Sequence, residues 1–148
     1  MTTLAATDLN TKPIHQSSFG NAVIYEGKYS VAANPTANDV IRALRIPGGT
    51  RITKLEVLND DLDTDGTPEI AVQVGFTPVN SADGPTADPD YWWATGATIL
   101  GTAGRNVSLS DPITFAYDVW VDILVEVDSQ TFQAGDIHVI AEGYGVGR

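Results

Sequence analysis

The stretch from Ile52 to Phe76 constrains the fold most, because apolar residues alternate with other residues at both of its ends. The apolar sides are Leu55 and Val57 in its first half, and Ile70, Val72, Val74 and Phe76 in its second half. A period of two is the signature of a half-buried strand. The intervening residues 59–68 are acidic and contain an Asp-Gly step and a proline, which favours a turn. The sequence therefore predicts an antiparallel hairpin around an acidic loop.

The rest of the chain repeats this pattern in short segments. Further strands are predicted at residues 23–31, 39–46, 107–109, 113–117, 119–127 and 137–144. One helical turn is predicted at residues 88–94, with Asp88 as its N-cap and Pro89 at its first helical position. Seven or eight short strands separated by turns predict an all-β protein with a single antiparallel β-sandwich or jelly-roll-like domain over residues 21–148. Residues 1–20 are too poor in apolar groups to bury a face, so we expect an extended N-terminal arm.

Composition narrows the possible partners. A chain of 148 residues suits one domain, and its net charge of −11 lacks the basic footprint that nucleic-acid binding requires. No lysine or arginine occurs between Leu55 and Gly104. The absence of cysteine excludes disulfides and thiolate ligands and fits a protein made in a reducing cytoplasm. The sequence shows neither a secretory signal nor a run of about 20 apolar residues, so we expect no membrane partner.

Signals for catalysis and for metal binding are weak. The two histidines, His15 and His138, are isolated, and neither a nucleophile elbow nor a phosphate-binding loop is present, so we expect no enzyme and no cofactor. Asp61, Asp63 and Asp65 match the opening of a calcium loop, but the twelfth position, where an EF-hand needs glutamate, is a valine. The loop is therefore either a solvated acidic turn or, as a weak candidate, a looser calcium site.

Three groups of residues are candidates for binding. Trp92 and Trp93, which follow Tyr91, are either a platform for sugars or core residues. Trp120 and Leu124 share the nominally wet side of the strand at 119–127, which indicates either a subunit contact or a strand covered on both sides. Four cations within thirteen residues form a possible basic docking patch: Arg42, Arg45, Arg51 and Lys54.

Three segments resemble the capsid decoration (cement) proteins of tailed bacteriophages: ALRIPGGTRITKLEVLNDDLDTDGTPEIAVQVGF, DPDYWW with the following ATGATILGTAGR, and IHVIAEGY. The resemblance covers about residues 38–145. Its marks are an apolar strand ending in a turn at Ile46-Pro47-Gly48-Gly49, the loop Asp61-Leu62-Asp63, and a strand ending in Val74-Gly75-Phe76. Gly48 stands where this family often carries a lysine, and the paired tryptophans are unusual for it.

The resemblance implies a β-sandwich subunit, without cofactor or catalytic residues, that decorates and stabilises the outer surface of a tailed-phage capsid. Its partners would be the major capsid protein and itself, as a homotrimer or less often a dimer, in a virion assembled in the host bacterial cytoplasm. The contacts we expect are the apolar residues of the arm and of the outward strand face: Leu4, Leu9, Ile14, Phe19, Trp120 and Leu124. The alternatives are a carbohydrate-binding module, lectin-like or a head fibre, that uses Trp92 and Trp93, and a minor tail or scaffold component.

Overall fold

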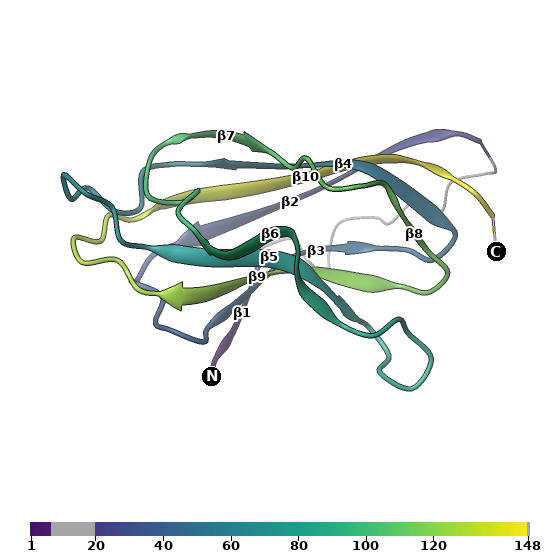
Figure 1. The fold of residues 1–148 in the computed structure, drawn as a ribbon, viewed down its shortest axis with the longest axis horizontal. Helices are drawn as coiled ribbons and strands as arrows, with labels where there is room; N and C mark the ends of the chain where they lie inside the picture. Colours follow the sequence, from purple (N-terminus) through teal and green to yellow (C-terminus); the bar gives the residue numbers. More distant parts are fainter. Residues whose placement is uncertain (7–19, 148) are drawn as a thin grey trace.

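The computed structural model describes residues 1–6 and 20–147, and in these residues ten strands and no helix are present (Figure 1). The strands are β1 (Thr3–Ala5), β2 (Ala22–Val31), β3 (Val40–Ile46), β4 (Thr50–Asn59), β5 (Ala71–Pro78), β6 (Asp88–Ala97), β7 (Gly104–Val107), β8 (Ile113–Phe115), β9 (Val119–Val127) and β10 (Gly135–Gly145). In this part of the chain, no helix exists that is long and apolar enough to cross a membrane.

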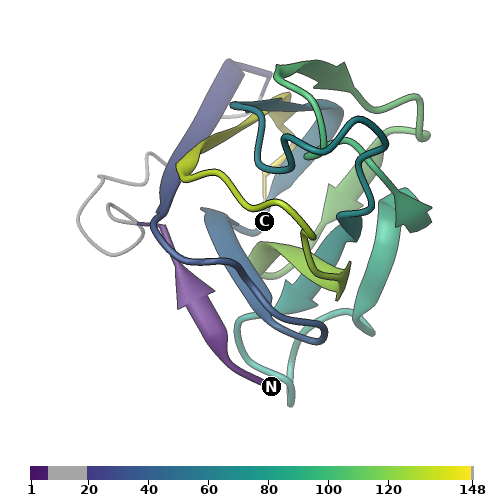
Figure 2. The same ribbon diagram turned by 90° about the vertical axis from the view of Figure 1, so that its left-hand side faces the viewer.

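The strands form two sheets that face each other, as the end-on view in Figure 2 shows. Sheet A has the order β1-β3-β9-β5-β6, and sheet B has the order β2-β10-β4-β7, with β8 also paired to β4. Neighbouring strands are antiparallel except β1 and β3, which are parallel. Leu55 and Val57 from sheet B and Val72 and Val74 from sheet A are fully buried between the two sheets. The prediction of an all-β sandwich is confirmed.

The predicted hairpin of residues 52–76 is wrong. β4 pairs with β10, β7 and β8 in sheet B, whereas β5 pairs with β9 and β6 in sheet A. The acidic loop therefore crosses from one sheet to the other, and Leu62 is fully buried at the crossing. Alternation shows which side of a strand is apolar but not which strand lies beside it, and ten residues easily span the roughly 10 Å between packed sheets.

The predicted helical turn at residues 88–94 is also wrong, because this segment belongs to β6. Its aromatic side chains explain the difference. Trp92 is buried in a cluster with Phe76 and Phe115, whose ring centroids lie 6.0 and 6.4 Å from that of Trp92. An extended backbone lets Trp92 reach the core, and this burial outweighs a local capping preference.

The N-terminal arm is in part an element of the sandwich. Thr3–Ala5 form β1, and Leu4 packs half-buried against the core. The amide of Thr2 donates to the Asp39 carboxylate at 2.9 Å, and the amide of Ala6 donates to the Arg42 carbonyl at 2.9 Å. Backbone pairing thus compensates for the low apolar content of this segment. The remaining arm candidates, Leu9, Ile14 and Phe19, lie outside the described residues.

Close packing of β5 on β6 depends on Gly75. A Cβ at this position would lie 2.0 Å from the carbonyl oxygen of Asp88 and 2.3 Å from the carbonyl carbon of Pro89. We expect Gly75→Ala to lower the free energy of unfolding by about 1–3 kcal/mol, because the β6 backbone must move away. Gly66→Ala is the matched control: nothing lies within 4 Å of its Cβ, so its urea midpoint should hardly change. Equal midpoints for both variants would contradict the described pairing of β5 with β6.

Candidate functional site

The outer face of sheet A carries a tryptophan in contact with two arginines. Along β9, Val119, Val121 and Ile123 are buried in the core, so Trp120 points to the opposite side of the sheet and is half-buried there. The guanidinium carbon of Arg42 lies 5.0 Å from the Trp120 ring centroid, and that of Arg45 lies 5.7 Å from it. Both distances fit cation–π contacts with the indole.

Carboxylates fix the two arginines in place. Arg42 donates from Nε to Oδ1 of Asp122 at 3.1 Å, and the Thr77 hydroxyl donates to Oδ2 of the same carboxylate at 2.6 Å. Arg45 forms an ion pair with Asp118. The buried Asp122 therefore holds the Arg42 guanidinium beside Trp120, and Asp118 holds that of Arg45. A preorganised tryptophan flanked by arginine is the composition typical of the centre of a protein–protein contact.

Leu124 lies on the same side of β9 as Trp120, four residues further along the strand. It is half-buried and opposite Val40 of β3 and Gln73 of β5. Sequence alternation therefore placed Trp120 and Leu124 on the correct, outward side of β9. It did not reveal the flanking arginines, because a register shift between Arg42 and Leu44 changes which β3 side chains face outward.

The four candidate cations do not form one patch. Arg42 and Arg45 lie on sheet A, whereas Arg51 and Lys54 lie on β4 of sheet B. Lys54 pairs with Glu56 at 2.8 Å and with Glu142 at 2.9 Å, and Arg51 donates to the hydroxyl of Thr114 at 3.1 Å. The turn at residues 47–49 thus separates the arginines of β3 from the two cations of β4, and these two groups are close in sequence but lie on different sheets. Arg42 and Arg45 beside Trp120 remain the cations of the candidate site.

The ion pairs of sheet B stabilise that sheet. Glu56 is buried, and hydrogen bonds from Lys54 and then Arg105 lower the pKa of Glu56 in spite of its burial. The hydrogen bonds that Lys54 donates to Glu56 and Glu142 in turn raise the pKa of Lys54. The two cations and the two carboxylates of this group neutralise each other within sheet B. Stabilisation of the sheet therefore explains why they are there.

The tryptophan pair offers no sugar platform. Trp92 is buried among Phe76, Tyr91 and Phe115, and Trp93 is half-buried and packs against the core. Stacking on a sugar needs an accessible aromatic face, which Trp92 lacks. The reading of Trp92 and Trp93 as a joint binding surface is therefore corrected: the buried position of Trp92 makes it a core residue.

The acidic loop uses its carboxylates to hold its own backbone. Asp63 is fully buried, and its two carboxylate oxygens accept the amides of Glu69 at 2.9 Å, Ile70 at 3.1 Å and Thr131 at 3.2 Å. Burial alone would raise the pKa of Asp63, but these backbone donors outweigh it and lower the pKa from 3.8 to about 2.

The hydrogen bonds of Asp63 to the backbone bear on the proposed calcium site at Asp61, Asp63 and Asp65. Asp61 accepts the amide of Asp63 at 3.1 Å, and Asp65 is exposed to solvent. Within residues 1–6 and 20–147, no group of three or more histidine, aspartate or glutamate side chains is arranged to hold a metal ion. The loop is best described as an acidic crossover anchored through Asp63.

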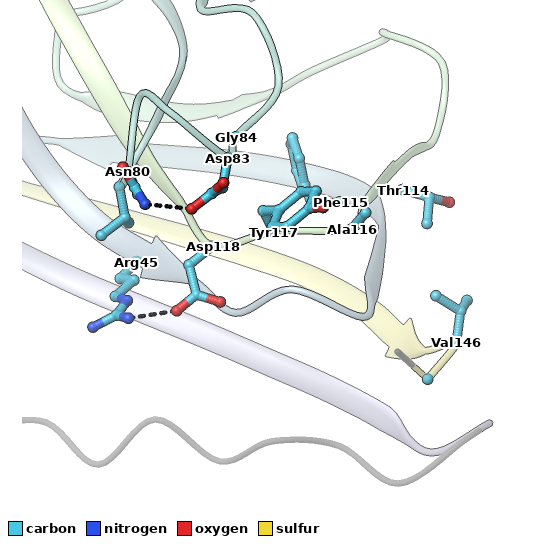
Figure 3. A pocket seen from close by; sticks show the side chains of 12 residues that line it. Arg45, Asn80, Asp83, Gly84, Thr114, Phe115, Ala116, Tyr117, Asp118 and Val146 are labelled. Atoms are coloured by element: carbon cyan, nitrogen blue, oxygen red, sulfur yellow. Dashed lines mark hydrogen bonds and ion pairs between the residues drawn. The ribbon is translucent and has the colours of Figure 1, made fainter.

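One end of the sandwich contains a pocket of about 640 Å³ (Figure 3). The Arg45–Asp118 ion pair lies on one side of it and Val146 on another, with Tyr117 between them. Asn80 donates to the Asp83 carboxylate at 2.7 Å and so closes the loop that forms a further wall. Arg45 contacts both Trp120 and this pocket, so the pocket adjoins the outer face of sheet A. Sequence analysis missed it because its walls come from four segments far apart in the chain.

No protein-family model and no curated protein matches the sequence. Among solved structures, the chain is similar to one in the capsid of Ralstonia phage GP4, with a TM-score of 0.76 and 19% identity over 98% of this chain and 99% of that one. It is also similar to a chain of the capsid asymmetric unit of cyanophage Pam1, with a TM-score of 0.68 and 22% identity over 90% and 91% of the two chains.

A third similar chain belongs to the acid-stable capsid of Helicobacter pylori bacteriophage KHP30, with a TM-score of 0.59 and 14% identity over 86% of this chain and 91% of that one. At these identities the comparisons establish the fold: a two-sheet β-sandwich that extends over nearly the whole of each chain.

Proposed function

We propose that this protein is a structural component of a tailed-phage virion that decorates and stabilises the outer surface of the capsid as a homo-oligomer, and that this oligomer is a trimer. The observation that carries the proposal is the whole-chain likeness to chains from three phage capsids. Since each match covers most of both chains, the similar proteins are sandwiches of about the same length as this one. Their similar length supports the role of a small accessory subunit.

The sequence supports the same proposal independently. Its resemblance to decoration proteins rests on turns and strand ends, and the acidic, cysteine-free composition suits a protein made in the host bacterial cytoplasm. In this role the protein has the major capsid protein and further copies of itself as partners. It has no catalytic task and needs no cofactor.

The outer face of sheet A is the surface we assign to the capsid. Trp120 supplies a large apolar contact, Arg42 and Arg45 supply fixed donors beside it, and Leu124 extends the apolar area. An indole held by cation–π contacts loses little conformational entropy on binding. The contacts assigned to Leu9, Ile14 and Phe19 of the arm remain a prediction from the sequence.

The proposal is tested by adding purified protein to capsids of the parent phage assembled without it and sedimenting the mixture. We expect saturable co-sedimentation of the wild type. Trp120→Ala should weaken binding by about 30-fold, the effect of losing roughly 2 kcal/mol at the centre of a contact.

Ile24→Ser is the matched control, because Ile24 is 68% exposed on β2 at the edge of the other sheet. This variant should bind as the wild type does. If the wild type fails to sediment with capsids, the decoration role is refuted. If Ile24→Ser loses binding while Trp120→Ala retains it, the capsid contact lies on sheet B instead.

A further inference from the structure

The acidic crossover contains an Asp-Gly step, Asp65-Gly66, on the surface of the protein. Both residues are exposed, and a Cβ added at Gly66 would meet no atom within 4 Å. Within residues 1–6 and 20–147, no hydrogen bond or ion pair engages the Asp65 carboxylate or the Gly66 amide. The carboxyl group and the following amide can therefore approach each other without breaking any contact.

The sequence has a second Asp-Gly step, Asp83-Gly84, and there the structure fixes both groups. The Asn80 side chain donates to the Asp83 carboxylate at 2.7 Å, and the Gly84 amide donates to the Asn80 carbonyl at 3.0 Å (Figure 3). A Cβ added at Gly84 would lie 2.2 Å from the Cβ of Pro78, so the backbone is closely packed at this point. The two steps have the same residues in opposite surroundings.

An unrestrained Asp-Gly step rearranges by a reaction that needs only its own atoms and water. The amide nitrogen of the glycine attacks Cγ of the protonated carboxyl group, and the amide proton leaves with the carboxyl hydroxyl as water. One water molecule then opens the five-membered imide, with no change of oxidation state. Opening at the side-chain carbonyl restores aspartate, whereas opening at the main-chain carbonyl gives isoaspartate. Glycine favours the attack because it has no Cβ and its backbone rotates freely.

We propose that Asp65 is a site of spontaneous conversion to isoaspartate in the folded protein, and that Asn80 protects Asp83 from the same reaction. Ring closure at Asp83 has to break the bond that Asn80 donates and the bond that it accepts, because one residue holds both reacting groups. Ring closure at Asp65 breaks none. The assignment is independent of the capsid role proposed above.

The anchors of the crossover lie outside the reacting step. On one side the Thr64 amide donates to the Thr131 carbonyl at 3.1 Å, and on the other the Glu69 amide donates to the Asp63 carboxylate at 2.9 Å. Isoaspartate keeps a free carboxylate but carries its main chain through Cβ and Cγ, which adds one atom to the backbone. The extra atom falls between the two anchors, so the crossover can keep both of them.

Incubation of the folded, full-length protein at mildly acidic pH, followed by peptide mapping, tests the assignment. A protease that cuts before aspartate but not before isoaspartate locates the product, and an isoaspartate methyltransferase supplied with S-adenosylmethionine quantifies it. Cleavage before residue 65 should be lost progressively, while cleavage before Asp83 persists. In urea both steps should react at similar rates, because the hydrogen bonds of Asn80 are then absent.

Two variants separate the effect of structure from that of sequence. Asn80→Ala should allow isoaspartate to form at Asp83 as well, whereas Gly66→Ala should suppress it at Asp65. The proposal is overturned if the folded wild type reacts at Asp83 as fast as at Asp65. It is equally overturned if residue 65 stays aspartate in the folded protein under conditions in which its counterpart in urea is converted. Both comparisons use the wild type and so remain decisive if Asn80→Ala does not fold.

Discussion

Replacing Asp63 by alanine is expected to lower the free energy of unfolding by about 3–5 kcal/mol, although the residue lies in a loop. Its carboxylate is fully buried and accepts three backbone amides, from Glu69, Ile70 and Thr131. Each hydrogen bond to a charged group contributes about 1.5–3 kcal/mol, and their loss leaves buried donors without an acceptor. The acidic crossover would then lose the group that ties it to residues on both sides of the sandwich.

The effect of Asp63 should depend on pH with a definite sign. Its pKa is lowered from 3.8 to about 2 in the folded protein, so the folded state favours the ionised carboxylate. This contribution to stability is fully present above the unfolded pKa and is lost as the pH falls through the folded pKa. The difference in stability between wild type and Asp63→Ala should therefore shrink between about pH 5 and pH 2.

Urea unfolding at several pH values measures both effects. Asp65→Ala is the matched control, because Asp65 lies in the same loop but is exposed, and its midpoint should stay within about 0.5 kcal/mol of the wild type. An Asp63→Ala variant that is as stable as Asp65→Ala at pH 7 would show that the buried carboxylate does not anchor the crossover.

Strand positions could be predicted because each strand has one buried side. In β9, Val119, Val121, Ile123 and Val125 are all fully buried, as their alternation predicts, although Val127 at the end of the strand is exposed. In β5, the predicted inward residues Val72, Val74 and Phe76 are buried, and so is Ala71 on the other side. The segment at 88–94 failed because capping preferences are worth about 1 kcal/mol, less than the burial of an aromatic side chain. The segment was thus assigned the wrong secondary structure by a local signal that tertiary packing overrides, whereas a core position for Trp92 was one of the two alternatives that the sequence left open.

The pairing of the strands could not be predicted from the sequence. Nothing in the alternation of residues 52–58 and 70–76 distinguishes two adjacent strands from two strands that face each other across a core. In both arrangements Val57 and Val72 point into the same interior. The information lies in long-range partners, such as the amide of Thr131 that reaches Asp63 from 68 positions along the chain.

Only part of the candidate site could be predicted, because the rest of it depends on strand pairing. The outward direction of Trp120 follows from period two, whereas its arginine neighbours depend on the pairing of β3 with β9 and on a register shift within it. The four cations lie on two sheets because the turn at residues 47–49 leads from β3 in sheet A to β4 in sheet B. The sequence reveals the turn, but it does not reveal that the strands before and after it belong to different sheets. The pocket beside Tyr117 needs all of these elements in place.

Phe76→Ala is expected to lower the free energy of unfolding by about 3–5 kcal/mol, because it opens a cavity where the two sheets meet. Phe76 is buried on β5 of sheet A, and its ring centroid lies 4.9 Å from that of Phe115 on β8 of sheet B. It also contacts Tyr91 and Trp92 edge to face, at 5.7 and 6.0 Å. The loss of one ring therefore removes a contact from every other member of the cluster.

Phe76→Leu separates volume from ring geometry, since a leucine keeps most of the apolar contact and should cost less than about 1.5 kcal/mol. Urea unfolding followed by tryptophan fluorescence measures both variants, and near-ultraviolet circular dichroism reports on the packing of Trp92. The alanine variant should lose much of that signal while its far-ultraviolet spectrum remains that of a β protein. Equal stabilities for the alanine and leucine variants would mean that the core closes around the missing ring, and that Phe76 does not join the two sheets.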